Sequence, residues 1–337
     1  MKKNDSTTYV RQIYLKCIPQ TAMHVENFDT RFVKLSNTKP LILKPHYISV
    51  DPYMRTRMQQ SGDGYIDRWT SGSTLSGWTL SEVIHSDLPE WNLGDWAIGH
   101  LPIQDKINHN GVGLWRHPYS VEPPLQFMHP MGMTGFTAWI GMNHLGKVCS
   151  SDTVLVSAAA GGVGSIACQL AKLAGADVIV TAGRERKRDW LRKMGFQKVL
   201  NHQSPNFQSD LMKASKGKIT LNFENIGGQI FESANEVMAT GGRVILCGLV
   251  SQYQENYPRR PPKNFKNLID RNVAVIPFTQ PEYNSCLPEF HKHMKKILLN
   301  GDLDWCLDVI EGGLTKVPSG LIGLFAGDNL GKRIIKC

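Results

Sequence analysis

Short apolar runs alternate with stretches of helical periodicity through the middle of the chain. The runs are rich in β-branched residues and comprise TVLVSA (153–158), DVIVTA (177–182), ITLNFE (219–224), RVILCG (243–248) and NVAVIPF (272–278). After the first run, Ile166, Leu170 and Ala174 recur at the spacing of one helical face. Nearly continuous apolar strands that alternate with helices predict a doubly wound parallel sheet, covered by helices on both faces.

The first 125 residues have a different pattern. Turn signals such as SGSTLSG (71–77) and NHNGVG (108–113) separate short apolar runs, including PLILKPHYISV (40–50) and DWAIGHLPI (95–103). This pattern predicts a β-rich domain over residues 1–125 and an α/β domain over 126–303. The segment from about 304 to 337 is rich in turns again, and we expect it to complete the first domain. Two domains also suit a chain of 337 residues.

Composition limits the class of protein. Hydrophobic residues make up 41% and charged residues 20% of the chain, as in soluble globular proteins, and no apolar run is long enough to span a membrane. The seven cysteines are scattered and include no CxxC pair, which indicates reduced thiols rather than a disulfide framework. The first residues, MKKNDSTTYV, contain no apolar leader. We therefore expect a cytoplasmic protein with no membrane partner.

One loop carries the strongest chemical signal. AAAGGVG (158–164) lies between the first strand and the first helix, and its spacing is a variant of the Rossmann dinucleotide fingerprint. Gly161 and Gly162 let the backbone approach a pyrophosphate, while Gly164 lets the helix lie close to the strand. The helix N-terminus adds free N–H groups and a positive dipole. We expect Gly161, Gly162, Val163 and Gly164 to bind a dinucleotide.

The charge pattern selects the dinucleotide. The net charge is +9, and its densest cluster is RERKR (184–188), directly after the second strand. NAD sites usually carry an acid here for the ribose 2′-hydroxyl, but the only nearby acid, Glu185, stands among basic residues. A basic cluster suits the 2′-phosphate of NADP(H). The cluster lacks interleaved aromatic residues, so we do not expect nucleic-acid binding.

No metal site is predicted. The chain has no pair of cysteines or histidines in a familiar ligand motif, and HKH (291–293) is expected on the surface. Hydrogen bonds would then have to polarise a substrate.

Several motifs together identify a family. They are VDPYMRTRM (50–58), GMTGFTAWIGM (132–142), FENIGG (223–228), CGLVSQY (247–253) and GDNLGK (327–332). With AAAGGVG, they resemble the zinc-free medium-chain dehydrogenase/reductases of the prostaglandin/leukotriene reductase type, which include alkenal double-bond reductases and curcumin reductase. Asp51 and Trp78 stand where zinc-bearing relatives have a cysteine ligand and a GHE motif. The resemblance covers nearly the whole chain.

The resemblance implies a GroES-like first domain, a homodimer, and NADPH-dependent reduction of the carbon–carbon double bond of enones and alkenals. It implies cofactor contacts at Gly161–Gly164, Lys187, Asn225, Cys247, Gly248, Ser251, Tyr253, Ile276, Phe278 and Asn329. Lys187 matches the lysine at the 2′-phosphate. The family commonly has a tyrosine after the third strand, but this chain has His202 there, whose imidazole can still donate to phosphate.

Catalysis is expected to depend on tyrosine. Tyr253 matches a tyrosine near the reacting carbonyl, while Tyr53 and Tyr65 match tyrosines of the substrate pocket. A hydroxyl at the carbonyl oxygen would stabilise the developing enolate, although each ring could instead serve packing alone. Two other functions remain open: an NADPH quinone reductase of the same fold, and a non-catalytic NADPH-binding protein.

Overall fold

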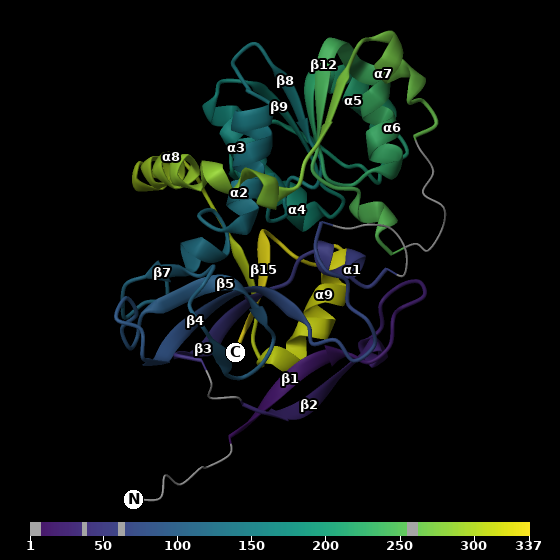
Figure 1. The fold of residues 1–337 in the computed structure, drawn as a ribbon. Coiled ribbons are helices and arrows are strands. Elements are labelled where there is room, and N and C mark those ends of the chain that lie inside the picture. Colours follow the sequence, from purple (N-terminus) through teal and green to yellow (C-terminus); the bar gives the residue numbers. More distant parts are fainter. Residues whose placement is uncertain (1–7, 36–38, 60–64, 255–261) are drawn as a thin grey trace, which may run out of the picture. The chain divides into compact units, whose positions relative to one another are not determined.

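The computed structural model describes residues 8–35, 39–59, 65–254 and 262–337 (Figure 1). The chain divides into two compact units. Unit 1 consists of Met1–Met128, Asp308–Asn329 and Arg333–Cys337, and unit 2 of His129–Leu307 and Leu330–Lys332. The chain therefore leaves unit 1 after Met128, returns to it at Asp308, and enters unit 2 again for the short stretch Leu330–Lys332.

Unit 1 is built mainly of antiparallel strands. Its strands are β1 (Tyr9–Leu15), β2 (Phe28–Lys34), β3 (Leu41–Ser49), β4 (Ser76–Ser86), β5 (Trp96–Pro102), β6 (Ile107–His109), β7 (Trp115–His117), β14 (Leu307–Ile310) and β15 (Lys332–Lys336). Strands β1 and β2 form a separate hairpin, and the others form a sheet of order β14-β15-β3-β4-β5-β7, with β6 paired to β3. The C-terminal strand β15 pairs antiparallel with β3, where Ile334 lies opposite Ser49.

The core of unit 1 draws on both ends of its sequence. Strand β3 buries Leu41, Leu43 and Ile48, and the short helix α1 (Tyr53–Thr56) follows it. Helix α9 (Val317–Phe325) adds buried side chains to the same hydrophobic cluster as Ile48. The C-terminal segment thus completes a core that the first strands alone would leave open.

Unit 2 contains a parallel sheet of six strands. They are β8 (Thr153–Val156), β9 (Asp177–Thr181), β10 (Lys198–Leu200), β11 (Ile219–Glu224), β12 (Met238–Leu246) and β13 (Ala274–Pro277), in the order β10-β9-β8-β11-β12-β13. All neighbouring pairs are parallel. This is the strand order of a Rossmann sheet. The predicted fold class, a doubly wound parallel sheet plus a β-rich domain, is confirmed.

Helices cover both faces of this sheet (Figure 1). They are α2 (Met133–Trp139), α3 (Gly164–Leu173), α4 (Glu185–Lys193), α5 (Phe207–Ser215), α6 (Gly228–Val237), α7 (Lys266–Asp270) and α8 (Leu287–Leu299). Helices α2, α3 and α8 lie on one side, and α5, α6 and α7 on the other. Strand residues such as Leu155, Ile179 and Val244 are fully buried between them, which explains their unbroken apolar runs. None of the helices among the described residues has the length and hydropathy of a membrane span.

Candidate functional site

The predicted cofactor residues of unit 2 gather at one edge of its sheet. Because all six strands are parallel, their carboxyl ends meet at the same edge. The loops that leave this edge carry the glycine loop after β8, Lys187 after β9, His202 after β10, Asn225 after β11, Tyr253 after β12 and Phe278 after β13. The sheet therefore brings together residues spread over more than a third of the sequence.

The glycine loop has the geometry of a phosphate cradle. Ala158 begins it with a φ of +50°, in the left-handed region that normally favours glycine. A Cβ atom on Gly164 would collide with the carbonyl group of Ala158, so only glycine lets α3 start this close to β8. The Val163 N–H, at the start of α3, has no protein acceptor within the described residues. The loop thus presents backbone amide to a ligand at a helix N-terminus.

Basic side chains lie at the end of β9 and β10. Glu185, the first acidic residue after β9 in the sequence, pairs with Arg188 and Arg192. Arg188 also donates to the backbone carbonyl of Ala182 at 3.3 Å, so it holds the end of β9. Lys187 is half-buried beside it in the first turn of α4.

His202 lies close to the same cations. Burial lowers the pKa of His202, and the charges of Lys187 and Arg188 lower it further. Its Nδ1 atom is buried and has no hydrogen-bond partner in the described part of the chain. A buried, unpartnered ring nitrogen beside two cations fits a phosphate oxygen of a ligand.

Asn225 is held by the backbone of the neighbouring strand end. Its Nδ2 atom donates to the Ser157 carbonyl, and its backbone N–H donates to Ser157 Oγ, both at 2.7 Å. These bonds join the ends of β8 and β11. Asn225 is only 8% exposed, so its role includes positioning these two loops.

Glu224 is a site residue that sequence reasoning missed. Its carboxyl group is fully buried and accepts hydrogen bonds from the amides of Ile226 and Gly227 at 2.6 and 2.8 Å, and from Ser157 Oγ at 3.0 Å. Burial raises the pKa of this carboxyl despite these bonds. An acid at the end of an apolar strand, directly before NIGG, was the available signal.

The loop after β12 places Tyr253 next to the glycine at position 248. The Leu249 N–H donates to the Tyr253 hydroxyl at 3.3 Å, and a Cβ on Gly248 would lie 3.1 Å from that oxygen. The hydroxyl thus accepts a hydrogen bond from the backbone of its own loop. Ser251 Oγ donates to the Ile226 carbonyl at 2.6 Å and links this loop to the one after β11.

Cys247 and the residues of β13 complete this edge. Burial raises the pKa of the Cys247 thiol to about 12, so it is protonated at neutral pH and is not a nucleophile. Ile276 is half-buried within β13, and Phe278 directly follows it, with its ring at 6.2 Å from that of Tyr283. Asn329 is buried in unit 1, just before the stretch Leu330–Lys332 that belongs to unit 2.

In unit 1, Tyr53 lies in a cluster of polar and aromatic side chains. Its ring centroid is 6.3 Å from that of His100. Burial raises the pKa of Tyr53 well above its ordinary value, and Asp51 adds to the shift. Tyr65, which is 55% exposed, adds a small further increase to the pKa of Tyr53.

Arg57 organises this cluster. Its guanidinium group lies 4.3 Å from the ring centroid of Trp69 and donates to the Asp67 carbonyl at 2.7 Å. It also lies 3.5 Å from His100 Nε2. Burial, with the Arg57 charge, lowers the pKa of His100 to about 4, so the ring is neutral at neutral pH. Sequence reasoning missed Arg57 and His100, although Arg57 lies within VDPYMRTRM.

Asp51 stands at the position that the resemblance compares with a zinc ligand. It is 3% exposed and accepts a short hydrogen bond from Ser49 Oγ. Among residues 8–35, 39–59, 65–254 and 262–337, no three His, Cys, Asp or Glu side chains are grouped as metal ligands.

HKH (291–293) is partly exposed: Lys292 is exposed, and the two histidines are half-buried. His291 and His293 belong to helix α8, which packs against α2. The indole N–H of Trp139 donates to His293 Nδ1 at 2.9 Å, and His291 Nε2 lies 3.3 Å from the Met131 carbonyl. Both rings therefore join the helices of unit 2 rather than pointing freely into solvent.

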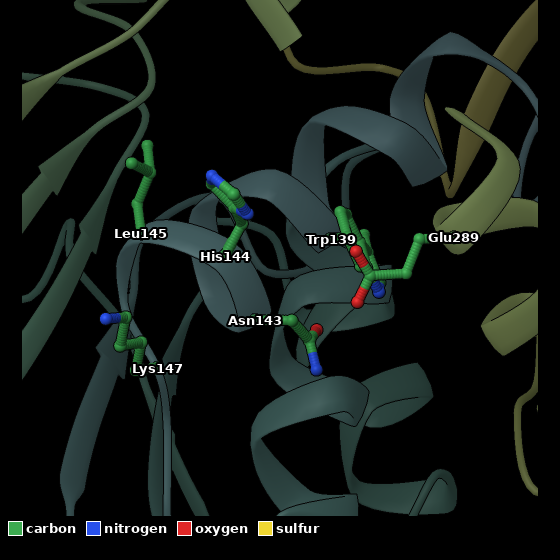
Figure 2. Close-up of a pocket in the computed structure, with 6 residues that line it drawn as sticks. All are labelled: Trp139, Asn143, His144, Leu145, Lys147 and Glu289. Atoms are coloured by element: carbon green, nitrogen blue, oxygen red, sulfur yellow. The ribbon is translucent and has the colours of Figure 1, made fainter. Parts of the chain in front are cut away.

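A pocket of about 490 Å³ lies elsewhere on unit 2. Trp139, Asn143, His144, Leu145, Lys147 and Glu289 line it (Figure 2). The π-helix Ile140–Leu145 forms its wall, and the carbonyl of the next residue, Gly146, accepts from Arg243 at 2.6 Å. Arg243 lies opposite Ala274, the first residue of β13, so this wall runs toward the amino edge of the sheet. No predicted site residue lines the pocket.

Comparisons with known proteins identify the family. The family model described as "Zinc-binding dehydrogenase" matches residues 162–296, and "N-terminal domain of oxidoreductase" matches 11–116. The chain is 31% identical to the NADPH-dependent curcumin reductase of Escherichia coli K12, over 97% of this chain and 96% of that protein. It is 28% identical to the NADP-dependent 2-alkenal reductase of Nicotiana tabacum, over 94% and 92% of the two chains.

A solved structure agrees over the same length. The crystal structure of CurA from Vibrio vulnificus in complex with NADPH matches with a TM-score of 0.91 and 31% identity, and covers 97% of this chain and 98% of that one. The strand order of unit 2, the motifs and these full-length similarities agree. The chain belongs to the zinc-free medium-chain dehydrogenase/reductases, in the branch of the curcumin and alkenal reductases.

Proposed function

We propose that this protein uses NADPH to reduce the carbon–carbon double bond of α,β-unsaturated ketones and aldehydes. The observation that carries the proposal is the carboxyl edge of unit 2, where a glycine loop, a basic cluster and a tyrosine hydroxyl stand at the ends of parallel strands. The names of the relatives support the same activity, since they include curcumin, 2-alkenal, pulegone and prostaglandin reductases.

The residues at this edge fit NADP(H). We assign the pyrophosphate to Gly161–Gly164 and the 2′-phosphate to Lys187 and His202. The Nδ1 atom of His202, which has no hydrogen-bond partner among the described residues, would then pair with a phosphate oxygen. Glu185 is engaged by two arginines and so does not serve a ribose hydroxyl. Asn225, Cys247, Gly248, Ser251, Ile276, Phe278 and Asn329 are assigned as further cofactor contacts.

The chemistry requires a donor at the substrate carbonyl. When bound, NADPH supplies the hydride that adds to the β-carbon. Negative charge then develops on the carbonyl oxygen, and we assign the Tyr253 hydroxyl to stabilise that charge by donating a hydrogen bond. Tyrosine or water then protonates the α-carbon. In unit 1 we assign Tyr53 and Tyr65 to substrate contacts, with Tyr53 as a second candidate donor.

The raised pKa of Tyr53 bears on its role. Because burial and Asp51 disfavour the phenolate, Tyr53 stays protonated across the physiological range and can only act as a hydrogen-bond donor or acceptor. The neighbouring His100 is neutral, so it offers no competing positive charge.

An NADPH oxidation assay with three substrates tests the proposal. A 2-alkenal, an aryl enone and a quinone are offered to the purified protein at matched concentrations. We expect reduction of the alkenal and the enone, with a saturated carbonyl product. Activity confined to the quinone would indicate a quinone reductase, and NADPH binding without turnover would indicate a non-catalytic binding protein.

We further propose that the protein is a cytoplasmic homodimer. All seven cysteines are free thiols, which suits a reducing compartment. Light scattering on the purified protein tests the oligomeric state, and a monomer at micromolar concentration would refute the dimer.

A further inference from the structure

A buried histidine contacts a backbone carbonyl of the glycine loop. His129 is 0% exposed, and its Nε2 atom lies 2.9 Å from the Gly162 carbonyl oxygen. Both residues belong to unit 2. Neither the family motifs nor the cofactor contacts assigned above include His129.

The hydrogen bond sets the tautomer of the ring. A carbonyl oxygen only accepts, so His129 Nε2 carries the proton and donates. Burial lowers the pKa of His129 to about 3, and the nearby charge of Lys332 also lowers it, so the ring is neutral at physiological pH. Nδ1 has no partner in the described residues. The ring is thus a neutral donor whose nearer partner is the Gly162 carbonyl, with Ser165 Oγ at 3.5 Å from the same nitrogen.

This contact determines the direction of an amide. The Gly162–Val163 peptide bond is trans, so its C=O and N–H groups point in opposite directions. When His129 holds the carbonyl on the inner side, the Val163 N–H points to the outer side. That N–H has no protein acceptor in the described part of the chain, and it stands at the N-terminus of α3.

Glycine at position 162 makes such a constraint necessary. With no side chain, its peptide can rotate more freely than that of other residues. The loop is packed on this side by Lys332 and Thr134, whose side-chain carbons would lie 3.1 and 3.4 Å from a Cβ on Gly162. His129 adds the one directional contact to the Gly162 carbonyl among these neighbours.

We infer that His129 is a positioning residue for the pyrophosphate: its Nε2–H holds the Gly162 carbonyl so that the Val163 N–H is aimed at a pyrophosphate oxygen. This inference rests on the proposed NADPH-binding function. It predicts that His129 increases the affinity for ligands that contain a pyrophosphate. The affinity for ligands that occupy only the adenosine 2′-phosphate site should not depend on His129.

The test compares two ligands on three variants. His129→Leu removes the donor at similar volume, and His129→Gln places an amide N–H at a similar reach. The backbone carbonyl of His129 keeps its bonds from the amides of Gly132 and Gly135 in every variant, so the start of α2 is preserved. His291→Leu is the matched control, because its ring also contacts a backbone carbonyl, that of Met131, outside the glycine loop. Dissociation constants are measured for NADPH and for adenosine 2′-monophosphate, which lacks a pyrophosphate.

We expect His129→Leu to weaken NADPH about 3- to 10-fold, the effect of one lost hydrogen bond, and to leave adenosine 2′-monophosphate within about twofold. His129→Gln should recover most of the loss, and His291→Leu should change neither ligand. Equal weakening of both ligands by His129→Leu would mean that the ring only supports packing, and no change in either would also overturn the inference. If the wild-type protein binds neither ligand, the proposed function itself fails and the inference falls with it.

Discussion

Replacing Tyr253 with phenylalanine separates chemistry from packing. The change removes one oxygen atom and keeps the ring. The lost bond from the Leu249 N–H is 3.3 Å long, beyond the usual range for N–H···O bonds, so we expect Tyr253→Phe to cost less than about 1 kcal/mol of stability. The fold, with its total stability of roughly 5–15 kcal/mol, should tolerate this loss.

The effect on catalysis should be larger than the effect on stability. Loss of a single donor to an oxyanion lowers the rate about 10²- to 10³-fold, or roughly 2.7–4 kcal/mol. We expect the low end for hydride transfer to an enone, because bound NADPH also carries hydroxyl groups. Affinity for NADPH should change little, since the hydroxyl acts on charge that develops only in the transition state.

Single-turnover kinetics gives the decisive measurement. Enzyme is mixed with NADPH and one enone, the loss of NADPH absorbance is followed, and cofactor affinity is measured separately. Tyr119→Phe serves as the control, because Tyr119 is an exposed tyrosine (66%) of unit 1 that is assigned no role in the reaction. An unchanged hydride-transfer rate in Tyr253→Phe would refute the assignment and direct attention to Tyr53.

Four further outcomes are expected. Lys187→Ala should weaken NADPH by about 1.5–3 kcal/mol and leave NADH unchanged, and equal effects on both would exclude contact with the 2′-phosphate. The lowered pKa of His202 keeps its ring neutral in the protein without cofactor, and a bound 2′-phosphate would favour protonation of the ring. NADPH should therefore bind more tightly as the pH falls. In His202→Tyr this pH dependence, measured relative to that of NADH, should disappear. Burial alone would raise the pKa of Asp152, but hydrogen bonds from Arg243 and Thr220 lower it to about 2. Its ion pair with Arg243 should therefore contribute about 1–2 kcal/mol above pH 4 that is lost toward pH 2, and Asp152→Asn should lower Tm at pH 7 but not at pH 2. Dialysis against EDTA should leave activity intact, whereas loss of activity restored by zinc would contradict the prediction that the protein has no metal site.

The sequence by itself determined the sheet of unit 2 and its loop chemistry. The runs 153–158, 177–182 and 219–224 correspond to β8, β9 and β11 within two residues, because strands buried on both faces must be apolar throughout. Strand β12 was predicted from residue 243 but begins at Met238. Met238 pairs with Ile219, and the register then shifts before Leu221, so no regular sequence pattern marks the start of the strand. The glycine loop could also be predicted, because the backbone of Ala158 lies too close to Gly164 for a side chain there.

Only the tertiary structure decided which polar residues work together. Glu224 looks like an ordinary acid in the sequence, and its role follows from amides and a hydroxyl that burial brings to it. His129 and Gly162 are separated by 33 positions, and no periodic pattern connects them. The same is true of Arg57 and His100. The pattern of apolar residues within a segment shows which face of a helix or strand is buried. Contacts between polar groups that are distant in sequence depend on how these elements pack together, and no single segment of the sequence determines that packing.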